Sequence, residues 1–317
     1  MKELENLRWR PLWTSHLGCL KGCLNYLKKD ISEAWLFGAT GHAFILNIHE
    51  VVCPSGPTAW QADQIFKLGT NVGFVVDGVD AWKGQEDFKE KQNLAWENTK
   101  KAIDEGYPCY GWELKMPEFY TVYGYDENGY YFSGPLADQG EGPIAWEKLG
   151  TSDIGCVGMY RVRSTEAASE EQTVRQALAF AIKFAEEPGD WVYDKYKSGS
   201  EGYKLWIQAL EENKAHDWGM AYNSAVWAEC RHFAVEFLKE ARRKLDLKYN
   251  NLFDEAIEHY GKVSKHLNQL AALFPFPPKD ELKDEQRRQL AVKYLKEANE
   301  AEQLGINSLK KLVVELN

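Results

Sequence analysis

The chain has 317 residues and a formal net charge of −10, with 48 Asp and Glu against 38 Lys and Arg. This acidic balance disfavours nucleic acid and anionic membrane surfaces as partners. The hydrophobic fraction of 44% excludes a disordered chain, and no apolar run approaches the roughly 20 residues that a membrane span needs.

The amino-terminal segment and the cysteines indicate the compartment. The segment MKELENLRWRPLW lacks the apolar core of a signal peptide, and the six cysteines are dispersed along the chain. We therefore expect a cytoplasmic protein with free thiols. Cys19 and Cys23 have no second Cys or His pair at zinc spacing, so no metal site is predicted. The glycine-rich stretch 38–41 lacks the lysine of a phosphate loop, so no cofactor is predicted either.

The first half of the chain is predicted to alternate helices with strands. Leucines at helical spacing indicate a helix from about 17 to 29, and a short helix or turn is expected over 31–37. Further helices are expected over 60–68 and 85–105. Strands are expected over 43–48, 71–77, 109–114, 119–125, 129–133 and 154–162, with Asn128-Gly129 as a hairpin turn.

The chain changes character near Ser164. From there on the pattern predicts helices only, over 169–187, 200–213, 217–244, 250–274 and 280–316. The predicted organisation is therefore α+β: an α/β domain at 1–164, made of helices and a small antiparallel sheet, followed by an all-helical bundle domain at 165–317.

Cys19 is the first candidate for chemistry. It follows a glycine near the predicted start of the helix over 17–29. At a helix start, unpaired backbone N–H groups and the helix dipole favour the thiolate, which is the nucleophilic form. The alternative is that Cys19 is a small buried hydrophobe in a Leu-rich helix.

The first half also resembles a known superfamily, on the strength of short patterns. These are the cysteine-bearing helix, then Gly106-Tyr107-Pro108, then EFYTVYGYD over 118–126 and YYFSGP over 130–135. Their order resembles the papain-like cysteine peptidases in their bacterial peptide-processing branch. Residues 10–163 are most similar to the N-terminal domain of the butirosin biosynthesis protein H family. The resemblance implies a papain-like fold used for acyl transfer to a small molecule, with Cys19 as the nucleophile.

Two positions depart from the superfamily pattern. Glu118 stands where the resemblance places the general-base histidine, and Gly134 stands where it places the orienting aspartate. An ordinary carboxylate is a poor proton donor at neutral pH, so the standard triad is absent. His42 and His16 are the candidates for a substitute base, and each could equally be a structural histidine.

Glu118 has a second candidate role. It could bind a basic group of a ligand, with Trp112, Tyr120 and Tyr125 as an aromatic wall beside it. The alternative is an exposed carboxylate at the start of a strand, with the three aromatic residues in ordinary sheet packing.

Three functions remain open on this basis. The chain could be a cysteine hydrolase or acyltransferase relative that acts on a small molecule or a peptide amide or ester through Cys19. It could be an inactive papain-like protein that retains the cleft and binds a small molecule. It could also be a structural scaffold. A small-molecule or peptide ligand is expected in the cleft between the domains, and the helices are expected to cover that cleft or to form a homodimer interface.

Overall fold

The computed structural model describes residues 1–316 and divides the chain into two compact units. The first comprises Met1–Ile31 and Gly73–Ala167, and the second comprises Ser32–Val72 and the chain from Ala168 onward. The last residue of the predicted domain 165–317 lies outside the described residues.

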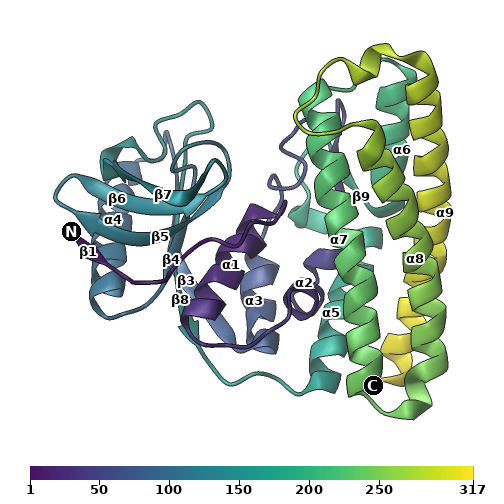
Figure 1. The fold of residues 1–317 in the computed structure, drawn as a ribbon, viewed down its shortest axis with the longest axis horizontal. Helices are drawn as coiled ribbons and strands as arrows, with labels where there is room; N and C mark the ends of the chain where they lie inside the picture. Colours follow the sequence, from purple (N-terminus) through teal and green to yellow (C-terminus); the bar gives the residue numbers. More distant parts are fainter. Residues whose placement is uncertain (317) are drawn as a thin grey trace. The chain divides into compact units, whose positions relative to one another are not determined.

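The first unit is built on a seven-stranded sheet (Figure 1). The strand order is β3-β8-β4-β5-β6-β7, and β1 pairs with β5. All the pairings are antiparallel. The bounds are β1 Lys2–Glu3, β3 Phe74–Trp82, β4 Cys109–Trp112, β5 Phe119–Asp126, β6 Gly129–Gly134, β7 Ala137–Ile144 and β8 Cys156–Ser164.

Two helices cover opposite faces of this sheet. Helix α1 (Ser15–Tyr26) packs on β5 and β4, and helix α4 (Phe88–Asp104) packs on β3 and β8. On β4, Tyr110 contacts α1 through His16, whereas its neighbour Cys109 faces the side chains of α4. Successive residues of a strand point to opposite faces, so the two helices enclose the sheet between them.

The amino-terminal lead-in crosses α1 at two glycines. A Cβ at Gly18 would clash with Trp9, and one at Gly22 would clash with the carbonyl oxygen of Arg8. The backbone amide of Arg10 donates to the carbonyl of Gly18 at 3.1 Å. The glycines therefore let the lead-in segment lie directly on the helix.

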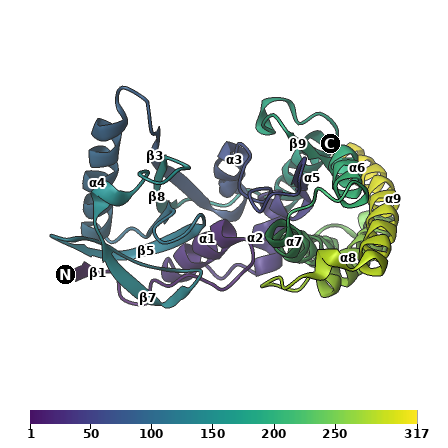
Figure 2. The same cartoon turned by 90° about the horizontal axis from the view of Figure 1, so that it is seen from above.

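The second unit is helical apart from one pair of short strands. Figure 2 shows its long helices α8 and α9 side by side, and α7 packs on α8. The strands β2 and β9 pair antiparallel. The bounds are α2 Glu33–Ala39, β2 Asn47–His49, α3 Asp63–Val72, α5 Glu170–Glu186, β9 Tyr196–Ser198, α6 Gly199–Glu211, α7 Asp217–Lys244, α8 Asn250–Leu273 and α9 Glu285–Glu315.

A buried ion pair fixes the early segment of this unit to its long helices. Arg231 on α7 is fully buried and donates to both carboxylate oxygens of Glu302 on α9, at 2.9 and 2.6 Å. It also donates to the backbone carbonyls of Ala43 and Ile45, at 2.9 and 2.7 Å. Tyr203 donates to the same carboxylate at 2.7 Å. Residues 32–72 therefore belong with the helices.

The predicted fold class agrees with this architecture at the level of an antiparallel sheet with helices and a helical carboxyl-terminal region. The predicted domains differ from the two units. The predicted boundary at 164/165 lies close to the observed change at 167/168, but residues 32–72 join the second unit. That unit also holds the strands β2 and β9, so it is not all-helical.

Candidate functional site

Helix α1 begins at Ser15, two residues before the predicted start. Cys19 is therefore the fifth residue of the helix and lies one turn inside it. The positive end of the helix dipole lies at Ser15 instead. The pair Thr14-Ser15, directly before the apolar run, is the sequence signal that would have placed the start correctly.

Ser15 contacts Glu118, the residue in the position of the expected histidine. The Ser15 hydroxyl donates a short hydrogen bond to Oε2 of Glu118, and it accepts one from the Phe119 backbone amide at 3.1 Å. Ser15 is 2% exposed and Glu118 is 7% exposed. Glu118 is therefore a buried carboxylate bonded to helix α1. The alternative, an exposed carboxylate at the start of a strand, is wrong.

Cys19 is sealed inside the first unit, with no exposed surface. Burial raises the pKa of its thiol far above the ordinary value; a hydrogen bond with Thr121 lowers it in part, and the charge of Glu118 raises it further. Burial also raises the pKa of Cys23. The thiol of Cys19 is thus protonated at neutral pH and out of contact with solvent, so the expected thiolate at a helix start is wrong.

His16 lies at the start of α1 and turns toward the sheet. Its Nε2 is 3.0 Å from the hydroxyl of Tyr110, and its ring stacks on Phe119 with centroids 4.4 Å apart. It is 5% exposed. The ring is therefore packed among aromatic side chains and bonded to a phenol, which is the arrangement of a structural histidine.

His42 belongs to the second unit, where it lies in a short 3-10 helix, His42–Phe44, so the strand predicted over 43–48 is present only at its end, in β2 Asn47–His49. Its Nδ1 is 3.7 Å from the sulfur of Cys230, and its ring meets the edge of Trp60. Burial and the nearby charge of Arg231 lower the pKa of His42 to about 4. His42 is thus a neutral core histidine whose cysteine partner is Cys230.

Gly134, in the position of the expected aspartate, has no room for a side chain. A Cβ there would clash with the ring of Tyr120. Tyr120 is itself buried, accepting from the Met116 amide at 3.2 Å and donating to the Pro135 carbonyl at 3.3 Å. An aromatic ring therefore occupies the space that an orienting carboxylate would need.

The three aromatic residues predicted as a wall do not form one. Trp112 pairs across the sheet with Phe119, so Tyr120, the next residue on β5, points to the opposite face. Tyr125 lies near the end of β5, past the register shift between Val122 and Gly124, so it is separated from Trp112 and Tyr120 along the sheet.

Tyr125 does line a hollow of about 560 Å³ at the far end of β5. Its ring is 5.8 Å from that of Trp96, and its hydroxyl donates to Asp104 at 2.9 Å. Trp96 was not predicted as a site residue, because its place in the apolar stripe of α4 indicates core packing alone.

Within residues 1–316, no three His, Cys, Asp or Glu side chains are grouped so as to hold a metal ion. None of the helices in that range has both the length and the apolar character required to cross a membrane. Comparisons with protein-family models and with curated proteins give no match for this chain.

Proposed function

We propose that the first unit is a papain-like domain without a working triad, and that the chain acts as a non-catalytic protein that binds a small molecule. The observation that carries this proposal is the hydrogen bond between Ser15 and Glu118. It joins the start of helix α1 to the start of strand β5, where the resemblance calls for a cysteine beside a histidine.

The chemistry of this pair is unsuited to nucleophilic catalysis. In a Cys–His pair the imidazole accepts the thiol proton and returns it to the leaving group near neutral pH. A serine hydroxyl is a far weaker acid than a thiol, and a Ser–Glu pair lacks the imidazole that accepts and returns a proton near neutral pH. The hydrogen bond between Ser15 and Glu118 instead holds the start of helix α1 to the start of strand β5.

The surrounding residues support the same conclusion. The thiol of Cys19 is sealed from solvent, and the ring of Tyr120 excludes a side chain at position 134. In this part of the domain the candidate nucleophile Cys19 is buried, position 118 holds a carboxylate, and position 134 holds a glycine. The hydrolase and acyltransferase alternatives would need a reactive thiol that the packing of α1 does not offer.

Binding is supported by hollows on the same unit. The depression beside Trp96 and Tyr125 has a volume of about 560 Å³, is open to solvent, and combines these two aromatic rings with charged side chains such as Lys100 and Asp126. A rigid sheet with helices on both faces is a suitable support for a binding site.

An activated ester tests this proposal. With p-nitrophenyl acetate, the wild type and Cys19→Ala should release p-nitrophenol at the same rate, because Cys19 takes no part. Cys53→Ala is the control, since Cys53 is partly exposed and could acylate without being catalytic. A burst or turnover that Cys19→Ala abolishes and Cys53→Ala retains would overturn the proposal.

A further inference from the structure

A second, smaller hollow of about 200 Å³ lies between α4 and the strands β3 and β8 of the first unit. The register places Asp77 opposite Arg161, and Arg161 opposite Cys109, so one row of side chains crosses three strands on the face covered by α4. Its lining includes Asp77, Lys101, Cys109, Met159 and Arg161.

Asp77 is fully occupied by two arginines. One carboxylate oxygen accepts from Nε of Arg161 at 2.8 Å, and the other accepts from Nε and a terminal nitrogen of Arg163 at 3.0 and 2.8 Å. Burial alone would raise the pKa of Asp77, but the two guanidinium groups outweigh it and lower the pKa. Asp77 stays ionised, with both oxygens used, so it has little capacity for a cationic ligand.

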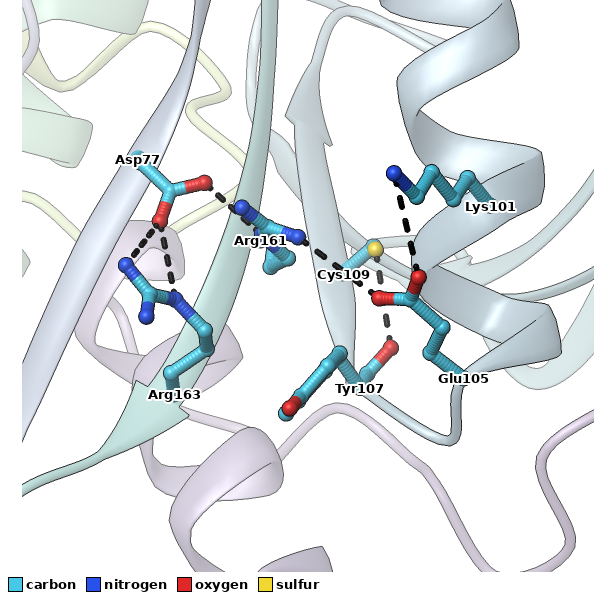
Figure 3. Close-up of polar contacts among 7 residues, drawn as sticks. All are labelled: Asp77, Lys101, Glu105, Tyr107, Cys109, Arg161 and Arg163. Atoms are coloured by element: carbon cyan, nitrogen blue, oxygen red, sulfur yellow. Dashed lines mark hydrogen bonds and ion pairs between the residues drawn. The ribbon is translucent and has the colours of Figure 1, made fainter.

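Arg161 uses its Nε for the bond to Asp77, which leaves its two terminal nitrogens to be accounted for. Figure 3 shows its side chain between Asp77 and Glu105, beside the sulfur of Cys109. Its Nη1 is 3.9 Å from Glu105, which is too far for a hydrogen bond. Among residues 1–316, its terminal nitrogens have no hydrogen-bond acceptor.

The charges around the hollow favour an anion. Two of the lining residues are cations, Lys101 and Arg161, and one is a carboxylate, Asp77; Figure 3 shows Arg163 and Glu105 as the further charged partners of this cluster. This cluster therefore has a positive excess within a chain whose net charge is −10. The terminal nitrogens of a guanidinium match the oxygens of a carboxylate or phosphate in a bidentate arrangement.

We propose that this hollow binds a small oxyanion, a carboxylate or phosphate group, through the terminal nitrogens of Arg161, with Lys101 at its edge. This inference rests on the proposed binding function and gives it a ligand class. Cys109 and Met159 supply an apolar lining, so the ligand is a compact anion or the anionic end of a small molecule.

Titration with inorganic phosphate tests the proposal, with potassium chloride at matched ionic strength to account for screening. Binding of phosphate should shift the arginine Nε–Hε signals of the wild type in ¹⁵N NMR. Saturable shifts at Arg161 are expected with phosphate and not with chloride. A parallel titration with acetate decides whether the site prefers phosphate or carboxylate.

The matched variants are Arg161→Gln and Arg163→Gln. Both remove an ion pair to Asp77, but only Arg161 lines the hollow. Arg161→Gln should weaken anion binding by about tenfold or more, and Arg163→Gln by about twofold or less. Should Arg161→Gln fail to fold, Lys101→Gln, an exposed substitution, should weaken binding by about twofold to fivefold.

Equal losses in the two arginine variants, or shifts that never saturate with either anion, would overturn the proposal. The two experiments distinguish a failure of the anion-binding proposal from a failure of the proposed function. An inert Cys19 with no anion binding removes only the ligand class, whereas ester turnover that depends on Cys19 removes the binding function itself.

Discussion

At the scale of single residues, the surroundings of a side chain decide its chemistry. Cys19 is a nucleophilic residue type, but burial leaves it a neutral thiol. Glu118 is an acidic residue type that usually lies on the surface, yet it is buried against Ser15. The sequence marks Cys19 as a candidate nucleophile and Glu118 as a candidate ligand-binding residue, but the burial of both depends on packing by distant segments and has no local signature.

Replacing Glu118 tests the structural role of its carboxylate. Glu118→Ala removes the acceptor of the Ser15 hydroxyl and leaves that hydroxyl buried, so the free energy of unfolding should fall by about 1.5–3 kcal/mol. Glu118→Gln keeps an acceptor of nearly the same shape, so it should cost less than half as much. Urea denaturation measures both, and equal stability of the wild type and Glu118→Ala would contradict this role.

The buried ring of His42 predicts a dependence of stability on pH. Its pKa is about 4 in the folded chain and about 6.5 when solvated, so the unfolded chain binds the proton more readily. The stabilising effect of keeping His42 neutral is complete above pH 6.5 and is lost as pH falls to 4. The loss is about 3 kcal/mol.

Since carboxylates also titrate in this range, the measurement compares the wild type with His42→Gln. Urea denaturation at a series of pH values should show that the variant loses less stability than the wild type between pH 6.5 and 4. Identical slopes for the two proteins would show that His42 does not titrate in this way.

At the scale of elements, helix α1 starts two residues earlier than predicted. Ser15 at this start, and not Cys19, therefore bonds to Glu118 and Phe119 at the start of β5. The apolar periodicity predicts helix α1, Gly106 and Pro108 predict the carboxyl-terminal end of α4, and the turn at Asn128-Gly129 predicts the hairpin β5–β6. The long helices α5 to α9 also follow their predicted ranges closely. Periodicity is strong in these segments because one face of each is buried.

Other elements lack such a signal. Strand β7 reads ADQGEGPI and is mostly exposed, so it has no apolar alternation and was not predicted. Strand β9 has three residues and exists because it pairs with β2. The placement of residues 32–72 in the second unit depends on Arg231, which is about 190 residues away in sequence, and no local pattern contains that information.

The close crossing of the lead-in segment over α1 gives a prediction at this scale. In an open helix, Gly→Ala usually stabilises by about 0.5–1 kcal/mol. At Gly22 the added methyl would collide with the carbonyl of Arg8, so Gly22→Ala should instead destabilise by about 1–3 kcal/mol.

Gly261 in α8 is the matched control, because a Cβ there meets nothing within 4 Å. Gly261→Ala should raise the midpoint of thermal unfolding, whereas Gly22→Ala should lower it. A stabilising Gly22→Ala would mean that the lead-in segment does not lie on α1.

At the scale of the whole molecule, each unit depends on contacts between segments far apart in sequence. In the second unit, the Arg231–Glu302 pair joins two long helices to the backbone at Ala43 and Ile45. Burial would lower the pKa of Arg231, but the charge of Glu302 outweighs it and raises the pKa, so the arginine stays charged. Breaking one partner leaves a buried charge without compensation.

Glu302→Ala should therefore destabilise the chain by about 3–5 kcal/mol. The double variant Arg231→Met with Glu302→Leu should cost less than the sum of its single substitutions, by about 1–3 kcal/mol, since neither partner is left charged and alone. Urea denaturation of the four proteins completes the cycle. Strict additivity would mean that the two side chains do not depend on each other.

The rate of alkylation of Cys19 shows whether its thiol is sealed inside the folded chain. Iodoacetamide at pH 7, followed by mass spectrometry of the tryptic peptides, compares Cys19 with the partly exposed Cys53 in the same sample. We expect that Cys53 is labelled while Cys19 reacts far more slowly than free cysteine, and only as the chain unfolds. Labelling of Cys19 in the folded chain faster than free cysteine would contradict it.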